Sequence, residues 1–157
     1  SIDLDTTYML LLDVDNFKQY NDTFGHQAGD TCLKTIAEII VEKCGGNNKI
    51  RAFRYGGDEF VIVYEDMTDE EVMWYASNIR LGIKERNLLA PSQEYGKLVT
   101  ISQGICNSVP ISTNKLWDYM YAADNALYEV KEHRKGEIVM LHKVLISQES
   151  LDEAKYS

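Results

Sequence analysis

The segment that most suggests chemistry is a short turn that displays two adjacent carboxylates between two apolar stretches. Residues 54–60 read Arg-Tyr-Gly-Gly-Asp-Glu-Phe, so Asp58 and Glu59 directly follow a pair of glycines. Glycine permits positive φ and lets the phosphates of a ligand approach the backbone closely. An ordinary acidic hairpin tip has the same composition, because such turns favour glycine and aspartate. Taken alone, the segment leaves both interpretations open.

A second pair of carboxylates, Asp13 and Asp15, lies at the end of the apolar stretch of residues 8–14. On its own this pair is typical of a solvated strand end. If that strand lies beside the turn, Asp13 and Asp58 would lie about 5 Å apart on neighbouring strands. Carboxylates that close repel each other, and Mg²⁺, which commonly takes one or two carboxylates plus substrate phosphates, relieves the repulsion. The two pairs together indicate metal-assisted displacement at phosphorus.

Length and composition predict one globular domain. The 157 residues are 45% hydrophobic and 26% charged, near the averages of globular proteins. The net charge of −9 argues against a nucleic-acid polymer as partner, because phosphate backbones are bound by clustered lysine and arginine. A small anionic substrate remains compatible if metal ions or helix N-termini offset the charge locally.

The sequence also gives expectations for the compartment. Cys32, Cys44 and Cys106 lie among apolar residues, so we expect buried free thiols in a reducing environment. The longest apolar run, residues 8–12, is far shorter than the roughly 20 residues of a membrane helix, and no signal peptide is visible. We therefore expect a domain in the cytoplasm, even if the parent protein is anchored in a membrane.

The elements that must position these residues follow from hydrophobic periodicity. Apolar or alternating runs predict strands at residues 8–14, 49–55, 60–64, 98–106 and 137–141. Helical spacing predicts helices at residues 16–24, 27–44, 68–83 and 116–130, with a loop at residues 91–96. Thr68 and Glu71 form a capping box that begins the third helix.

This order of elements predicts an α+β fold with one sheet of about five strands and helices packed on one face. A split β-α-β, ferredoxin-like core suits it. Because no linker divides the chain, residues 1–157 are expected to form a single domain. Residues 136–157 comprise the last strand and a tail without an assignment.

Several segments resemble, in order and spacing, the GGDEF domain, the catalytic domain of diguanylate cyclases. The match covers about residues 8–135 and includes Asp13-Val14-Asp15-Asn16-Phe17-Lys18, Asn21-Asp22, Gly25-His26, Gly29-Asp30, Arg54 to Phe60, Thr100-Ile101-Ser102-Gln103-Gly104 and Ala123-Asp124-Asn125-Ala126-Leu127-Tyr128 followed by Lys131. The resemblance implies a nucleotidyl-cyclase palm core. It also implies that two GTP molecules are condensed into cyclic di-GMP and pyrophosphate, with Mg²⁺ or Mn²⁺ as cofactor.

The resemblance assigns metal and catalytic roles to four residues. The Asp13 carboxylate, the Val14 carbonyl and Asp58 would bind the metal. Asp58 and Glu59 would be catalytic, with Glu59 assisting at the reacting 3′-hydroxyl or with a second metal ion. His26 is expected to be structural, ordering the turn before the long helix.

It also assigns substrate-binding roles. Asn21 and Asp30 would recognise guanine. Backbone N–H groups near Phe17 and Lys18 would cradle the terminal phosphates, and the Lys18 and Lys131 side chains would contact the triphosphate.

Three features depart from the family pattern. The Asp-x-Leu-Thr turn that precedes the first strand, and supports the dimer, is not seen. The product-inhibition motif Arg-x-x-Asp is replaced by Asn47-Asn48-Lys49-Ile50, so cyclic di-GMP is not expected to inhibit through residues 47–50. The usual ending Lys-x-x-Gly-Arg-Asn is also altered, and Lys135 would take the place of the phosphate-binding arginine as a point charge.

An active cyclase is therefore the leading hypothesis. Since one domain would bind one GTP and the product contains two guanosines, turnover requires a homodimer. The alternative is a catalytically silent GGDEF module that binds GTP or a partner and regulates a neighbouring domain, and a sensory domain is expected upstream. A polymerase-like palm acting on a nucleic-acid template shares the metal chemistry but is disfavoured by the acidic charge.

Overall fold

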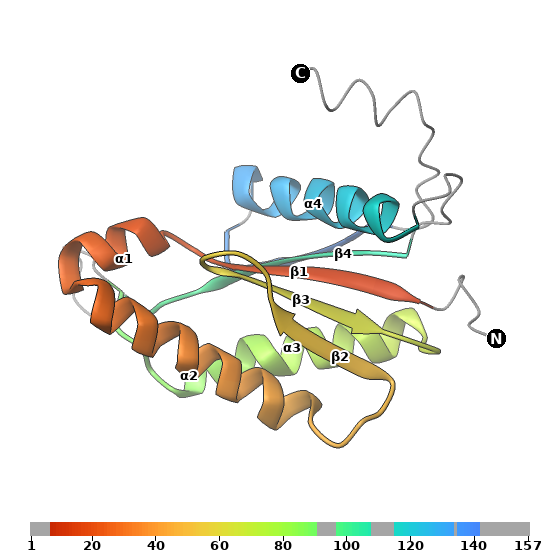
Figure 1. Ribbon diagram of the computed structural model, residues 1–157, viewed down its shortest axis with the longest axis horizontal. Coiled ribbons are helices and arrows are strands. Elements are labelled where there is room, and N and C mark those ends of the chain that lie inside the picture. The colour runs from red at the N-terminus through yellow and green to blue at the C-terminus, as the bar shows by residue number, and fades with distance from the viewer. Residues whose placement is uncertain (1–6, 91–96, 108–114, 134, 142–157) are drawn as a thin grey trace.

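The computed structural model describes residues 7–90, 97–107, 115–133 and 135–141 (Figure 1). In chain order the elements are β1 (Tyr8–Val14), α1 (Phe17–Phe24), α2 (His26–Cys44), β2 (Ile50–Arg54), β3 (Glu59–Tyr64), α3 (Asp69–Glu85), β4 (Ile101–Cys106), α4 (Lys115–His133) and β5 (Ile138–Leu141). The predicted loop at residues 91–96 and the unassigned tail after residue 141 lie outside the described residues.

The strands form one five-stranded sheet in the order β2-β3-β1-β4-β5. β1 is antiparallel to both of its neighbours, β3 and β4, while β5 is parallel to β4. The first four strands have the order of a split β-α-β unit, in which β3 lies between the consecutive parallel strands β1 and β2. The predicted α+β fold with a ferredoxin-like core is confirmed.

Helices cover both faces of the sheet, so the expectation that they pack on one face is wrong. Figure 1 shows α2 and α3 on one side and α4 on the other. Beneath α2 and α3 lies the larger core, which includes Leu10, Leu12 and Ile62. Alternate residues of the same strands, such as Met9 and Leu11, form a second core with α4. That second apolar face must also be covered, which is the physical reason for the helix on the far side.

Most element boundaries lie within two residues of their predictions; α4 ends three residues later than predicted, and β4 begins three residues later. This strand begins at Ile101 rather than at residue 98. Leu98 instead forms an isolated bridge with Leu89, and the Val99 N–H donates to the Leu88 carbonyl. The residues that precede β4 therefore pair with the chain that follows α3.

Three local expectations are also tested. The capping box at α3 is confirmed, because Glu71 N–H donates to Thr68 Oγ1 at 3.2 Å and Thr68 N–H donates to Glu71 Oε1 at 3.3 Å. All three cysteines are buried free thiols, as predicted. Among the described helices, none combines the length and the apolar character needed to cross a bilayer.

Candidate active site

The glycine-containing turn joins β2 to β3 and is held by hydrogen bonds on both sides. The Tyr55 N–H donates to the Glu59 carbonyl at 2.8 Å, and Gly56 has φ of 73°, a left-handed conformation that favours glycine. The Arg54 guanidinium donates from Nε and Nη2 to the Gly57 carbonyl, at 3.1 and 2.7 Å. Arg54 received no role from the sequence, yet it pins the turn that carries Asp58.

β1 pairs with β3 and lies beside this turn, which is the condition on which the predicted metal site depends. In the antiparallel register Asp13 is opposite Glu59, and the Val14 N–H reaches the Asp58 carbonyl at 3.4 Å. The two acidic pairs that lie far apart in the sequence are therefore neighbours at one edge of the sheet.

The electrostatics of this edge disfavour full ionisation. Burial, opposed by Lys131 and reinforced by Asp58, raises the pKa of Asp13 to about 7. Burial also raises the pKa of Glu59, with Asp58 and Asp124 adding to the effect. Asp13 Oδ1 is itself buried without a hydrogen-bond partner. An orphaned carboxylate oxygen among like charges is an electrostatic cost that a bound cation would remove.

The donor atoms at this edge fit a hard divalent cation. Carboxylate oxygens come from Asp13 in β1 and from Asp58 in the turn beside it, and oxygen is the ligand type that Mg²⁺ and Mn²⁺ prefer. Within the described residues, no group of three or more His, Cys, Asp or Glu side chains forms a ready ligand set. A cation here would therefore complete its coordination with water or substrate oxygens, as Mg²⁺ commonly does.

Asp15, two residues further on, has different surroundings that the sequence analysis did not foresee. Its side chain is only 2% exposed and accepts hydrogen bonds from Thr100 Oγ1 at 2.7 Å, Ser102 Oγ at 2.6 Å and Lys131 Nζ at 2.9 Å. Two hydroxyl residues at alternate positions of an otherwise apolar segment, Thr100 and Ser102, were the available signal.

Lys131, predicted to contact the triphosphate, is an internal counter-ion in this structure. Besides Asp15, its ammonium group contacts Asp13 Oδ2 at 3.2 Å. Lys135, expected to replace the phosphate-binding arginine, donates to Asn16 Oδ1 at 3.1 Å. Neither lysine lines the cavity described next.

Five of the predicted site residues line one cavity of about 450 Å³, here called the hairpin cavity. It lies between α1, α2 and the β2–β3 turn, and its lining residues are Phe17, Lys18, Asn21, His26, Asp30, Leu33, Arg54, Gly57 and Asp58. Both residues predicted for guanine, two of those predicted for the phosphates and one of the predicted metal ligands thus share one concave surface.

Gly29 fixes the position of Asn21 in this cavity. A Cβ atom at Gly29 would lie 1.7 Å from Asn21 Oδ1 and 2.8 Å from Asn21 Cγ, so any other residue would displace the carboxamide. Asn21 Oδ1 is buried against this glycine without a hydrogen-bond partner. Asp30, the next residue, is half-exposed and pairs with Lys34 at 3.1 Å.

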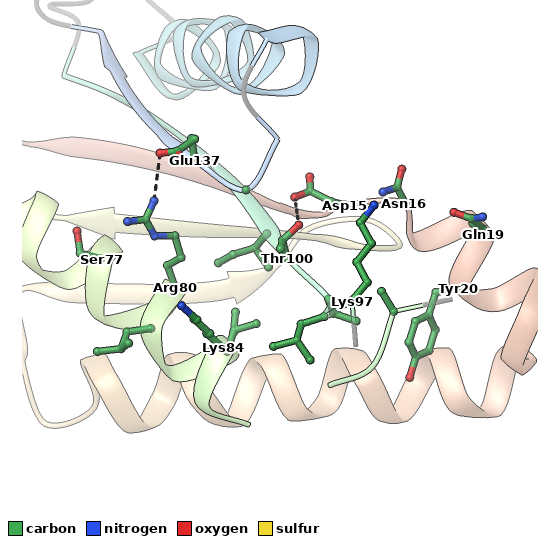
Figure 2. Close-up of a pocket in the computed structure, with 17 residues that line it drawn as sticks. Asp15, Asn16, Gln19, Tyr20, Ser77, Arg80, Lys84, Lys97, Thr100 and Glu137 are labelled. Atoms are coloured by element: carbon green, nitrogen blue, oxygen red, sulfur yellow. Dashed lines mark hydrogen bonds and ion pairs between the residues drawn. The ribbon is translucent and has the colours of Figure 1, made fainter. Parts of the chain in front are cut away.

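A larger cavity, of about 900 Å³, lies elsewhere, between α1, α3 and the start of β4 (Figure 2). It shares no lining residue with the hairpin cavity and contains none of the predicted site residues. Size alone does not identify the active site here, because Phe17, Lys18, Asn21, Asp30 and Asp58 line the smaller cavity.

Known proteins of one family are similar to this chain. The family described as "Diguanylate cyclase, GGDEF domain" matches residues 4–137. Diguanylate cyclase A of Treponema denticola is 33% identical over 136 residues, which cover 87% of this chain and 35% of that protein. The chain thus spans about a third of the length of this relative.

Solved structures give the same result. The GGDEF domain of DgcB from Caulobacter crescentus, solved in complex with c-di-GMP, superposes with a TM-score of 0.73 at 30% identity, covering 85% of this chain and 77% of that one. The active GGEEF domain of a Vibrio cholerae diguanylate cyclase gives a TM-score of 0.69 at 27% identity, covering 88% and 84%. From the acidic edge, the family match and these structural likenesses, we conclude that this chain belongs to the GGDEF domain family of diguanylate cyclases.

Proposed function

We propose that this domain condenses two GTP molecules into cyclic di-GMP, and that the hairpin cavity and the acidic edge beside it are the active site. The observation that carries the proposal is the convergence of Phe17, Lys18, Asn21, Asp30 and Asp58 on one cavity next to Asp13. The named diguanylate cyclase relatives support the same reaction at the level of the family.

Within this proposal, residues of α1 and α2 bind and orient the nucleotide. Asp30, when ionised, can only accept hydrogen bonds, which suits the N1–H and the amine of guanine and mismatches adenine. Asn21 lines the same cavity and would be the second base contact. Lys18 and the backbone at the start of α1 face the phosphates, where a cationic side chain and free N–H groups offset the charge of the triphosphate.

The acidic edge would supply the chemistry. A Mg²⁺ or Mn²⁺ ion held by Asp13, the Val14 carbonyl and Asp58 would stabilise the charge that develops on the phosphoryl oxygens. Glu59 takes up the proton of the 3′-hydroxyl, because burial and neighbouring carboxylates raise its pKa and so make it a better base near neutral pH. Lys131 holds Asp13 in place through its bridge to Asp15.

Two domains must meet for one product molecule to form. Each domain binds one GTP and presents its 3′-hydroxyl to the α-phosphate held by the partner across a two-fold axis. Product inhibition through residues 47–50 is not part of this proposal. There the Asn47 amide donates to the Tyr75 hydroxyl at 2.9 Å, and Lys49 pairs with Asp66 at 3.3 Å, so neither offers the missing motif.

The decisive experiment is to incubate the purified domain with GTP and Mg²⁺ and to resolve the products by chromatography. We expect cyclic di-GMP, with a turnover per domain that rises with protein concentration and rises further in a forced dimer. GTP binding without any product, even in the forced dimer, would favour the silent regulatory module instead. When GTP and ATP are supplied equally, a dominant mixed cyclic dinucleotide would contradict the guanine assignment of Asp30.

A further inference from the structure

The larger cavity has the features of a small-molecule site that the proposed reaction does not use. Its volume of about 900 Å³ is within the range of ligand pockets, and it lies apart from the hairpin cavity. Figure 2 shows Arg80 and Lys84 entering it from α3, and Lys97 and Thr100 entering from the segment that leads into β4. We refer to it as the α1–α3 cavity.

The chemistry of its walls selects for one kind of ligand. Ile83, Val99 and Ile101 are buried side chains that form an apolar floor. The charged groups around this floor are Asp15, Arg80, Lys84, Lys97 and Glu137.

The anionic groups among them already have partners. Asp15 is bound to Lys131 at 2.9 Å, and Glu137 to Arg80 at 3.2 Å. In the part of the chain that the structure describes, Lys84 has no ion pair, and its ammonium group lies beside the cavity. In a chain of net charge −9, the apolar floor thus lies below a positive charge that no carboxylate offsets.

We propose that the α1–α3 cavity binds a small organic anion with an apolar body, and that its occupancy alters the acidic edge through Thr100, Asp15 and Lys131. The binding part stands by itself, whereas the consequence for turnover rests on the cyclase activity proposed above. No residue of the hairpin cavity takes part in the binding.

A single hydroxyl proton connects the cavity to the acidic edge. Thr100 lines the cavity and donates its O–H to Asp15 Oδ2 at 2.7 Å. A hydroxyl group has only one proton to donate, so an anion that accepts it would compete with Asp15. Asp15 also binds Lys131, which contacts Asp13 Oδ2 at 3.2 Å. A change at Thr100 therefore reaches a proposed metal ligand in three contacts.

Binding is tested with anilinonaphthalene sulfonate, an aromatic anion whose fluorescence rises in an apolar site. We expect saturable binding with one site per folded domain, weakened at least about tenfold by Lys84→Glu, because contacts to a charged group are worth this much. Ser77→Trp, which fills the cavity from α3, should also abolish it. The matched control is Arg51→Glu, a charge reversal on exposed β2 that lies outside the cavity.

The outcome of this titration is unambiguous when each variant melts as the unmutated domain does. Equal dye affinity in Lys84→Glu, Ser77→Trp and the unmutated domain would place the dye elsewhere and overturn the proposed site. If Arg51→Glu weakened dye binding as much as Lys84→Glu does, the loss would come from the change in net charge alone. That result would also contradict the proposed site.

Coupling is tested with Mg²⁺ alone, measured by calorimetry with and without saturating dye. We expect the dye to change Mg²⁺ affinity severalfold in the unmutated domain, and Mg²⁺ to change dye affinity by the same factor, since linkage is reciprocal. Thr100→Val removes the shared proton, so the dye should still bind while the coupling disappears. Dye binding with unchanged Mg²⁺ affinity would refute the coupling. Because this measurement needs no GTP turnover, its failure is distinct from a failure of the proposed function.

Discussion

Asp13 and Asp15 are the same residue type, two positions apart at the end of one strand, in opposite surroundings. Three donors from β4, α4 and the segment before β4 satisfy Asp15. Asp13 receives one ammonium group, keeps a buried oxygen without a partner and has a pKa raised to about 7 by burial and by Asp58. A buried polar group without a partner lowers stability, so its presence requires an explanation that Asp15 does not.

The contrast separates a carboxylate that holds the fold together from one that we propose binds a metal ion. Asp15 ties β1 to the strand and the helix that flank it, which fixes the edge on which Asp13 lies. Asp13 keeps one buried oxygen without a partner at a cost in free energy, and a bound cation would remove that cost. In our proposal, Asp15 therefore supports the fold and Asp13 takes part in the chemistry.

The largest effect expected from breaking this contrast is on turnover. Asp13→Asn and Asp58→Asn should each reduce cyclic di-GMP synthesis about 10³-fold, because a metal site contributes several kcal/mol to catalysis. The melting temperature should stay equal or rise, since the substitutions remove like-charge repulsion. The measurements are initial rates and thermal melts, with Glu132→Gln on exposed α4 as control. Near-normal rates in either variant would show that these carboxylates do not hold a catalytic metal.

Asp15→Asn should have the reverse profile, with its main effect on stability. Removing one partner of a buried ion pair costs about 3 kcal/mol or more, and the amide also turns a donor toward Thr100, Ser102 or Lys131. Ser102→Ala, which removes one donor, should cost about 1 kcal/mol. Urea denaturation measures both. A stability loss for Asp15→Asn no greater than that for Asp13→Asn would erase the distinction between the two carboxylates.

The fold shows which elements the sequence predicts well and where the interpretation of the sequence was too simple. β1 was predicted with its observed bounds, because an unbroken apolar run leaves few alternatives. The same run should have excluded a sheet covered on one face only. In residues 8–12 both alternating sets are apolar, so Met9 and Leu11 needed the cover that α4 provides. β4 begins late because Leu98 and Val99 bond to the chain after α3, a long-range pairing that periodicity does not reveal.

For the candidate site, the sequence predicted which residues belong to it better than it predicted the contacts between their side chains. The family resemblance in order and spacing gave site roles to five of the nine residues that line the hairpin cavity. It did not reveal that Lys131 bridges two aspartates, because that contact joins positions 116 residues apart through side-chain geometry. Arg54 belonged to the matched segment but had no predicted role. Its hydrogen bonds to the Gly57 carbonyl depend on the conformation of the folded turn, which the sequence does not show.

Asn21, like Asp13, has a buried oxygen without a partner, and a smaller effect, on GTP affinity, is expected there. Gly29→Ala would place a methyl group 1.7 Å from that oxygen and should weaken GTP binding about tenfold by displacing the carboxamide. Alanine is otherwise the better residue in a helix, by about 0.5–1 kcal/mol, so a loss must come from the clash.

A double-mutant cycle separates this clash from a general defect. In an Asn21→Ala background the clash with the carboxamide disappears and only a contact of 3.2 Å with Phe17 Cζ is left, so adding Gly29→Ala should cost much less GTP affinity than in the unmutated domain. Calorimetric titration of the four proteins with GTP gives their binding free energies, and thermal melts compare their stabilities. Additive losses in the double variant would mean that Gly29 does not act through Asn21.

The smallest expected effect is the pH dependence that Asp13, unlike Asp15, adds to the free energy of unfolding. Burial and Asp58 raise the pKa of Asp13 from the ordinary 3.8 to about 7, so between these values the folded domain keeps a proton that the unfolded chain has released. The folded state then binds more protons, and the contribution of Asp13 to the free energy of unfolding must fall as pH rises from about 4 to about 7. The slope is at most about 1.4 kcal/mol per pH unit, the value for one proton.

Asp13→Asn isolates this contribution, because every other titrating group is shared with the unmutated domain. The difference in unfolding free energy between the two proteins, measured by urea denaturation without divalent metal, should shift toward the variant as pH rises and level off above about 7. Mg²⁺ favours the ionised carboxylate, so at pH 8 it should stabilise the unmutated domain and leave the variant nearly unchanged. At pH 5, where Asp13 retains its proton, Mg²⁺ should stabilise neither. A pH-independent difference would mean that Asp13 ionises as readily in the folded domain as in the unfolded chain, and the orphaned oxygen would then carry no electrostatic cost.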